Sequence, residues 1–234
     1  MVSVTQGGAG RHAKATQPTA PSYPDLPDAA TLSTEQLPAD LRDTEVRERH
    51  LSAVDLSERD ATGVRLIECR LDEVDLSGAI LRRASIRDAV FRGGSWANVD
   101  AHQATLTRVE LRGVRLTGAV LAASKIADVR FIDCRLNLSS VRFGQLERVT
   151  FENCRLEEAD LYEATLTSVI FAGCDLTQAN LAKATFARCE MRECELNGVG
   201  GPEQLRGVGM PWPDLVRHAA VLAQGLDVHI LEDE

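Results

Sequence analysis

The sequence predicts an all-β solenoid in which the chain winds as a square coil, one turn for every 20 residues. The first observation is a period of five in the large apolar residues, which matches neither the period of a strand nor that of a helix. From residue 51 to residue 196, every position whose number ends in 1 or 6 is Leu, Ile or Phe, apart from Ala61, Trp96, Ala101, Val141 and Met191. A chain in which large apolar residues recur every five positions over this length, with no insertion, is a repeat protein.

The second observation is a small side chain two positions before each large one, as at Val74, Ala79 and Cys154. Only Arg49 and Arg59, in the first turn, break this rule. The other three positions of each unit are mainly polar, charged or Gly. Two inward residues in every five suit a chain that turns a corner after each unit, and four such sides close one coil.

The third observation is that residues 20 apart are alike. The repeated sets are Phe131, Phe151 and Phe171; Cys134, Cys154, Cys174 and Cys194; and Val109, Val129, Val149 and Val169. Such sets make sense only if residues 20 apart stack on successive coils, which hydrogen-bond to one another as in other solenoids. With stacked strands about 4.8 Å apart, the repeats predict about 7.5 coils and a rod about 36 Å long.

The chain divides into three parts. Residues 1–45 are rich in proline, including PTAPSYPDLP, and predict a flexible, disordered arm that cannot bury a core. Residues 46–199 are expected to form the β-helix. Residues 200–234 predict a connector punctuated by Gly and Pro, followed by a short helix that begins at Pro213 and ends at Gly225.

The repeats resemble those of the pentapeptide-repeat family. AVDLS (53–57), EADLY (158–162), GCDLT (173–177) and QANLA (178–182) match its pattern A(D/N)LXX. The resemblance implies a right-handed quadrilateral parallel β-helix. It also implies a terminal helix that caps the rod and joins two copies end to end.

No catalytic signature accompanies the repeats. The cysteines lack metal-ligand spacing and are interpreted as small inward hydrophobic residues. The five histidines are scattered, and a filled β-helix offers no natural substrate cleft. We therefore expect a protein that is not an enzyme and needs neither a cofactor nor a metal.

A cytoplasmic location is expected. No apolar run approaches the roughly 18 residues of a membrane span, and the first residues lack the basic-then-apolar order of a secretory signal. The six cysteines are then expected to be reduced.

Charge suggests where a partner binds. The net charge of −9 argues against a general nucleic-acid binder, although residues 51–196 are nearly balanced, with 22 acids and 19 bases. Stacking by 20 predicts a basic column at Arg115, Arg135 and Arg155 that turns acidic at Asp175 and Glu195. The second half of the rod carries a candidate acidic partner-binding face: Glu147, Glu152, Glu157, Glu158, Asp160 and Glu163. The alternative is an ordinary solvated surface.

A second candidate contact is apolar. Leu138 and Phe143 occupy outward sites in the unbroken register, and Tyr162 is expected close to Phe143, one coil later. Either these residues form an exposed apolar patch that contacts a partner, or a local bulge or register slip buries them.

Two functions follow from the family resemblance. The Qnr and Mfp types of pentapeptide-repeat protein bind DNA gyrase, imitate a DNA duplex and protect against topoisomerase-targeting antibiotics. If that carries over, this chain modulates gyrase or topoisomerase IV, and its six acids stand in for phosphates. Two rods would then join through the C-terminal helix, by Leu215, Val216, Ala219 and Leu222. The alternative is a scaffold for an unrelated protein partner.

Overall fold

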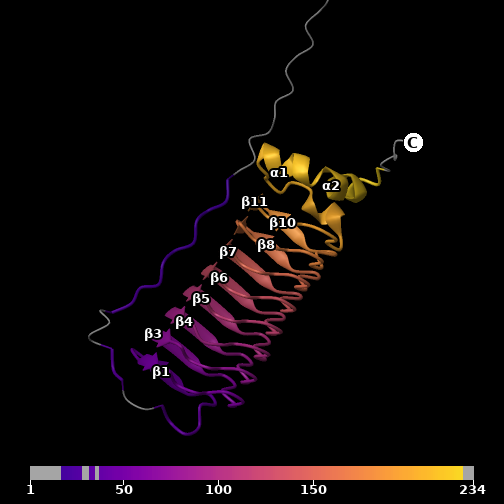
Figure 1. The fold of residues 1–234 in the computed structure, drawn as a ribbon. Helices are drawn as coiled ribbons and strands as arrows, with labels where there is room; N and C mark the ends of the chain where they lie inside the picture. Colours follow the sequence, from indigo (N-terminus) through magenta and orange to yellow (C-terminus); the bar gives the residue numbers. More distant parts are fainter. Residues whose placement is uncertain (1–16, 28–31, 35–36, 229–234) are drawn as a thin grey trace, which may run out of the picture.

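The protein is a rod of stacked turns with two short helices at its C-terminal end (Figure 1). The structure is a computed structural model that describes residues 17–27, 32–34 and 37–228. Parallel strands follow one another at intervals of 20 residues, which confirms the predicted parallel β-solenoid, with about seven turns. Residues 1–16 of the chain, which belong to the predicted arm, lie outside the described residues.

All strands pair in parallel within one sheet, in the order β1-β3-β4-β5-β6-β7-β8-β10. Three short strands lie off this path. Strand β2 pairs with β3, and β9 lies between β7 and β11 and pairs with both. The bounds are β1 Glu45–Arg47, β2 His50–Ser52, β3 Arg65–Asp72, β4 Ser85–Arg92, β5 Thr105–Arg112, β6 Lys125–Ile132, β7 Gln145–Glu152, β8 Thr165–Thr167, β9 Ile170–Ala172, β10 Thr185–Ala187 and β11 Glu190–Arg192.

Each turn pairs with the next along four sides. Two sides are the halves of a long strand, as where Leu106 pairs with Ile126 and Leu111 with Phe131. The other two are single bridges, such as Arg115 to Arg135 and Val120 to Ser140. The predicted four-sided coil of 20 residues is therefore confirmed.

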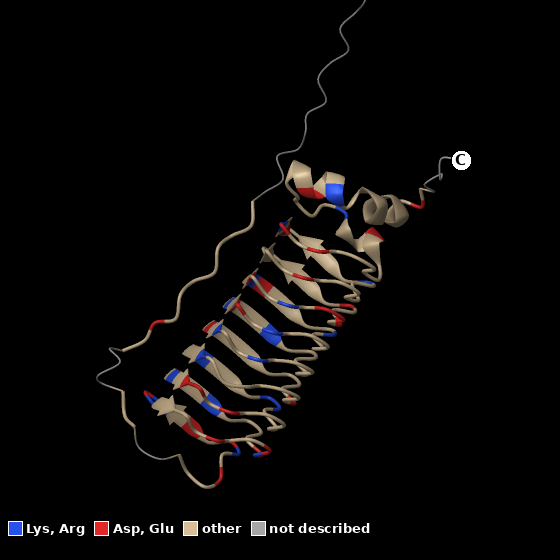
Figure 2. Cartoon of the chain, viewed as in Figure 1, with Lys and Arg blue, Asp and Glu red and all other residues tan. Residues whose placement is uncertain are grey.

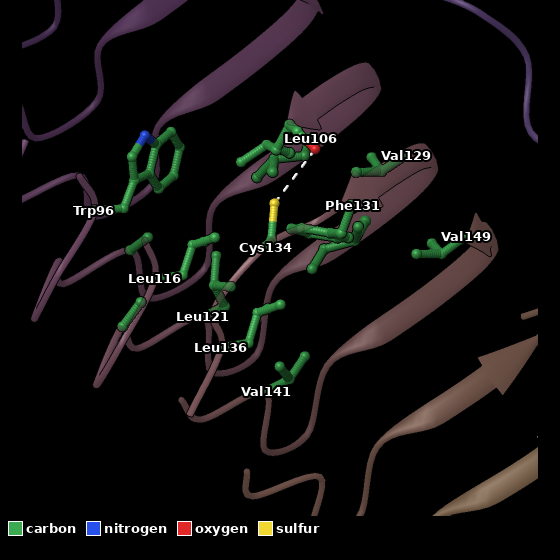
Figure 3. Packing of buried hydrophobic residues seen from close by; sticks show 14 of the residues in the cluster. Trp96, Leu106, Leu116, Leu121, Val129, Phe131, Cys134, Leu136, Val141 and Val149 are labelled. Atoms are coloured by element: carbon green, nitrogen blue, oxygen red, sulfur yellow. Dashed lines mark hydrogen bonds between the residues drawn. The ribbon is translucent and has the colours of Figure 1, made fainter. Parts of the chain in front are cut away.

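The period-five residues form the core. All of them are buried except Phe186, which is half-buried and still packs against the core. Phe151 stacks between Phe131 and Phe171, with ring centroids 4.8 and 4.9 Å apart and planes within 6°. Figure 3 shows Phe131 and Cys134 among the core side chains. Burial of each large apolar side chain stabilises the rod by about 1.5–3 kcal/mol.

The cysteines also lie in the core, as predicted. Cys134, Cys154, Cys174 and Cys194 are at most 2% exposed. Each thiol donates a hydrogen bond to a backbone carbonyl of the preceding turn, for example Cys154 Sγ to Phe131 O at 3.4 Å. Burial also raises the pKa of the Cys69 and Cys189 thiols, so these stay protonated and unreactive.

The C-terminal segment caps the rod differently from the prediction. Instead of one helix over 213–225, a 3₁₀-helix at Pro202–Leu205 is followed by α1 (Trp212–Arg217) and α2 (Ala219–Gly225). The two α-helices meet at His218, which is 3% exposed and whose Nε2 lies 2.8 Å from Cys194 O. Asp214, also buried, accepts a hydrogen bond from the Glu193 amide at 2.7 Å. These two tertiary hydrogen bonds anchor α1 on the last turn, and the helix breaks where His218 turns inward.

At the other end, the rod begins before the predicted boundary. β1 starts at Glu45, but Leu41 is 3% exposed and belongs to the core cluster. Ser33 already forms a parallel bridge with Arg49. Residues 17–27 run alongside the rod rather than away from it (Figure 1), with contacts described below.

Candidate interaction surfaces

The six predicted acidic residues lie around the rod and not along it. All belong to one 20-residue turn: Glu147 and Glu152 lie on β7, and the other four lie on the two sides that follow. Because each side of a turn faces a different direction, these carboxylates form an acidic belt around a single turn. The predicted single acidic face is corrected accordingly. Sequence proximity had grouped residues that the coil distributes over different sides.

Cations partly neutralise this acidic belt. Glu147 is paired with Arg148, Glu152 with Arg130 at 3.7 Å, Asp160 with Arg142 at 3.1 Å and Glu163 with Lys183 at 3.1 Å. Glu157 accepts a hydrogen bond from the side-chain amide of Asn137. Within the described part of the chain, the exposed side chain of Glu158 has no hydrogen bond or ion pair. Glu157 and Glu158 are therefore the two belt acids that no cation compensates.

Phe143 and Tyr162 form an exposed aromatic corner with two cations. Their rings meet edge to face at 5.9 Å, and the Arg142 guanidinium lies 5.4 Å from the Phe143 ring and 4.7 Å from the Tyr162 ring. Lys183 Nζ donates to Tyr162 Oη at 2.6 Å. Phe143 is 49% exposed. Sequence reasoning missed Arg142 and Lys183, although stacking by 20 places Arg142 beside Tyr162 and Lys183 beside Glu163.

The register is unbroken at this corner, which decides between the two predicted alternatives. The amides of Leu138 and Phe143 donate to Glu157 O and Tyr162 O, each at 3.0 Å, as in every regular turn. Leu138 is 57% exposed and lies on the preceding corner of the same turn. Both residues have positive φ, 58° and 59°. They are therefore an exposed apolar feature, not a buried bulge.

Acidic and basic residues are mixed along the rod (Figure 2). The predicted basic column is confirmed by bridges from Arg115 to Arg135 and from Arg135 to Arg155, and the column continues into Asp175 and Glu195. No continuous negative stripe follows from this arrangement.

A second column, which sequence reasoning missed, alternates acid and base. On β4 to β7, Arg108 donates two hydrogen bonds of 2.6 Å to Asp88, and Arg148 donates two of 2.8 Å to Asp128. Both carboxylates are nearly buried, at 4% and 7% exposed. The hydrogen bonds from Arg148 lower the pKa of Asp128 below its ordinary 3.8, so that it is ionised at neutral pH. The 20-residue spacing of these four residues was the available signal.

The C-terminal end carries exposed apolar side chains. Leu215 and Val216 are 37% and 59% exposed, and Ala219 is exposed beside them. Trp212, which sequence reasoning did not single out, is 76% exposed. Leu222 differs from the prediction, because it faces the rod and packs against the core with Val221. Over the residues that the structure describes, no helix is long and apolar enough to span a bilayer. Nor do His, Cys, Asp and Glu side chains gather there into a potential metal site.

Among solved structures, the chain is similar to several repeat proteins at low identity. HetL, a pentapeptide repeat protein involved in heterocyst differentiation regulation in the cyanobacterium Nostoc sp. strain PCC 7120, is 20% identical, with 69% of this chain and 86% of HetL covered and a TM-score of 0.31. Full-length QnrB1, a plasmid-mediated fluoroquinolone resistance protein, is 15% identical over 68% of this chain and 100% of QnrB1, with a TM-score of 0.34. Rfr23, a pentapeptide repeat protein from the cyanobacterium Cyanothece 51142, is 15% identical over 66% and 89% of the two chains, with a TM-score of 0.19. The curated proteins include no matching sequence.

Family models match the repeats themselves. The model for a pentapeptide repeat region matches residues 84–161, and the model for eight copies of the repeat matches 50–88, 145–181 and 170–199. Together the matches run from residue 50 to residue 199, well over half of the chain and most of the span that forms the rod. The chain belongs to the pentapeptide-repeat proteins.

Proposed function

We propose that this chain is a non-enzymatic, cytoplasmic protein that binds a protein partner through the outside of its rod. The observation that carries this proposal is the placement of Leu138 and Phe143. A left-handed backbone costs about 1 kcal/mol or more for a residue with a side chain, and exposed apolar area gains nothing from the core. Elsewhere among the described residues such corner positions are filled by Gly, by polar residues or, at Ala53 and Ala123, by a single methyl group, and none carries a large apolar side chain. Large apolar side chains placed there are expected to contact a partner.

The specific partner that we propose is a type II topoisomerase, DNA gyrase or topoisomerase IV. In this proposal the rod imitates DNA, modulates the enzyme and protects it from topoisomerase-targeting antibiotics. Glu157 and Glu158 support it, since they lie side by side and no cation pairs with either. Because the other four belt acids are paired with Arg or Lys, Glu157 and Glu158 would carry most of the mimicry.

Dimerisation through the C-terminal helices is part of the same proposal. Leu215, Val216 and Ala219 are exposed on the outer surface of the cap, together with Trp212. Leu222 would act indirectly, by holding α2 on the rod.

A scaffold for an unrelated protein is the second candidate, and the aromatic corner favours it. Rings covered by Arg142 and Lys183 suit a partner that offers both apolar and acidic groups, which a phosphate-like surface does not need. The mixture of acidic and basic residues along the rod also fits this candidate.

A supercoiling assay with purified gyrase and full-length protein separates the two candidates. Topoisomerase modulation predicts inhibition of supercoiling, or protection from a gyrase poison, at micromolar protein. If supercoiling and poisoning are both unchanged while Phe143→Ala abolishes binding to another partner, the scaffold function replaces it.

A further inference from the structure

The arm beside the rod has a periodic sequence. Pro18, Pro21, Pro24 and Pro27 are spaced three apart, and all four are half-buried. The residues between them are exposed, apart from the half-buried Leu26. A polyproline-II helix has three residues per turn, so prolines with this spacing share one edge. That edge faces the rod.

Two backbone amides of the arm donate to the rod. The Ser22 amide donates to Asp128 Oδ1 at 2.9 Å, and the Asp25 amide donates to Asp88 Oδ1 at 3.1 Å. Each donor directly follows a proline. Between them, the ring of Tyr23 lies 5.1 Å from the Arg130 guanidinium. The arm therefore runs past β6 and then β4, against the direction in which the turns progress (Figure 1).

The spacings of donors and acceptors match. Three residues of polyproline-II helix advance about 9.3 Å, and two turns of the rod advance about 9.6 Å. Asp88 and Asp128 lie two turns apart in one column, with Arg108 between them. One Pro-x-x unit of the arm therefore corresponds to one acid–base repeat of the column.

The acceptors are also held by the rod itself. Each carboxylate accepts two hydrogen bonds from an arginine of the next turn, and with the arm in place it is nearly buried. An ionised carboxylate gives a charge-assisted hydrogen bond, the stronger kind. Because the two backbone amides donate at both acceptors, proline spacing and extended backbone are the main features that the site selects, with added contacts from the Ser22 side chain to Asp128 and from the Tyr23 ring to Arg130.

We propose that the face of β4 to β6 built on Asp88, Asp128 and Arg130 is a recognition site for polyproline-II segments with Pro-x-x-Pro spacing, and that residues 18–27 of the same chain fill it. The tethered arm is then a built-in ligand. A proline-rich segment of another protein binds this face only when it displaces the arm. This site adjoins the acidic belt, since Arg148 also pairs with Glu147 and Arg130 with Glu152. It does not depend on the topoisomerase proposal, which rests on Glu157 and Glu158.

Amide hydrogen exchange in the full-length protein tests the docked arm. The amides of Ser22 and Asp25 should exchange about tenfold or more slowly than those of Thr19 and Ala20, to the same degree at low and high protein concentration. Equal exchange at all four amides would overturn the proposal. Protection that grows with protein concentration would show that the arm binds a second copy, which also contradicts it.

Variants of the arm test recognition without disturbing the rod. Ser22→Pro with Asp25→Pro removes both donors and keeps the polyproline-II backbone. A labelled peptide of residues 17–27 should bind this variant about tenfold or more tightly than the wild type, whose site is occupied. Thr19→Pro with Ala20→Pro is the matched control and should behave as the wild type. A peptide N-methylated at Ser22 and Asp25 should not bind. Equal binding to variant and wild type, no binding to the variant, or binding of the methylated peptide overturns the proposal.

Discussion

Phe143 and Tyr162 meet edge to face across adjacent turns, with ring centroids 5.9 Å apart. Both rings lie on the outside of the rod, and Phe143 is half-exposed. Eight residues after Phe143, Phe151 stacks flat between two other phenylalanines in the core. A phenylalanine in this protein thus lies either in the core or on the surface, and its position within the repeat of five decides which.

These roles predict opposite results for alanine substitution. Phe151→Ala should lower the free energy of unfolding by about 3–5 kcal/mol, because it leaves a cavity in the stack. Phe143→Ala should change it by no more than about 0.5 kcal/mol, as for other surface sites. Denaturant unfolding of the two variants measures both. A loss of several kcal/mol for Phe143→Ala would place this ring in the core and remove the main support for a partner site.

Ser139 predicts a stabilising substitution. Its hydroxyl is fully buried and has no hydrogen-bond partner, and the same position is Ala119 and Ala159 in the adjacent turns. Ser139→Ala should therefore stabilise the rod by about 1 kcal/mol. Ser124 is the matched control, since its buried hydroxyl donates to Ala101 O at 3.0 Å. Thermal melts should separate the two, and a destabilised Ser139→Ala would mean that the hydroxyl has a partner.

The acid–base column predicts a pH dependence. The pKa of Asp128 is lowered chiefly by the hydrogen bonds from Arg148. Burial raises the pKa of Asp88, but the hydrogen bonds from Arg108 and the Asp25 amide, with the charges of Arg108 and Arg87, together lower it below its ordinary value. A depressed carboxyl pKa adds stability that is present above the unfolded value, near 3.8, and lost as pH falls through the folded pKa. Protection of the Ser22 amide should consequently persist at pH 4 and disappear only at a lower pH. Loss of protection between about pH 7 and 5 would contradict the ionised pair as acceptor.

The C-terminal cap predicts two classes of variant. Leu215→Asp and Val216→Asp should give a monomer that loses only the stability contributed by dimerisation, because in the single chain both side chains are exposed. Leu222→Asp should lower the melting temperature, because this side chain packs on the core. Light scattering and thermal unfolding measure the two effects. An unchanged mass for Leu215→Asp would mean that the helices only cap the rod.

The fold could be predicted from the sequence because phase alone decides which side chains point inward. That is why Phe151 and Cys154 were assigned to the core, and why Tyr162 was expected beside Phe143. Whether Phe143 was exposed could not be decided, since it depended on backbone hydrogen bonds that a slip would have changed. The unbroken bond from its amide to Tyr162 O decides it.

Other features depend on contacts and directions in three dimensions, which the order of residues along the chain does not give. Glu147 and Glu158 are close in sequence, but the corners of the coil point them in different directions. His218, at which α1 ends and α2 begins, forms a hydrogen bond to Cys194 O on the last turn, a partner 24 residues away in the sequence. The prolines of the arm predicted only a segment that cannot bury a core. Their match to Asp88 and Asp128 could not be predicted, because it depends on which face of the rod the arm follows.

The most direct test of the topoisomerase proposal compares two charge reversals in the gyrase supercoiling assay. Glu158 and Glu58 occupy the same corner position on different turns, both exposed and both with φ of 56°. Glu158→Lys should weaken gyrase inhibition by about tenfold, whereas Glu58→Lys should leave it unchanged, with equal melting temperatures for both. Inhibition that is absent in the wild type, or reduced equally by the two substitutions, would contradict a role for the acidic belt in binding gyrase.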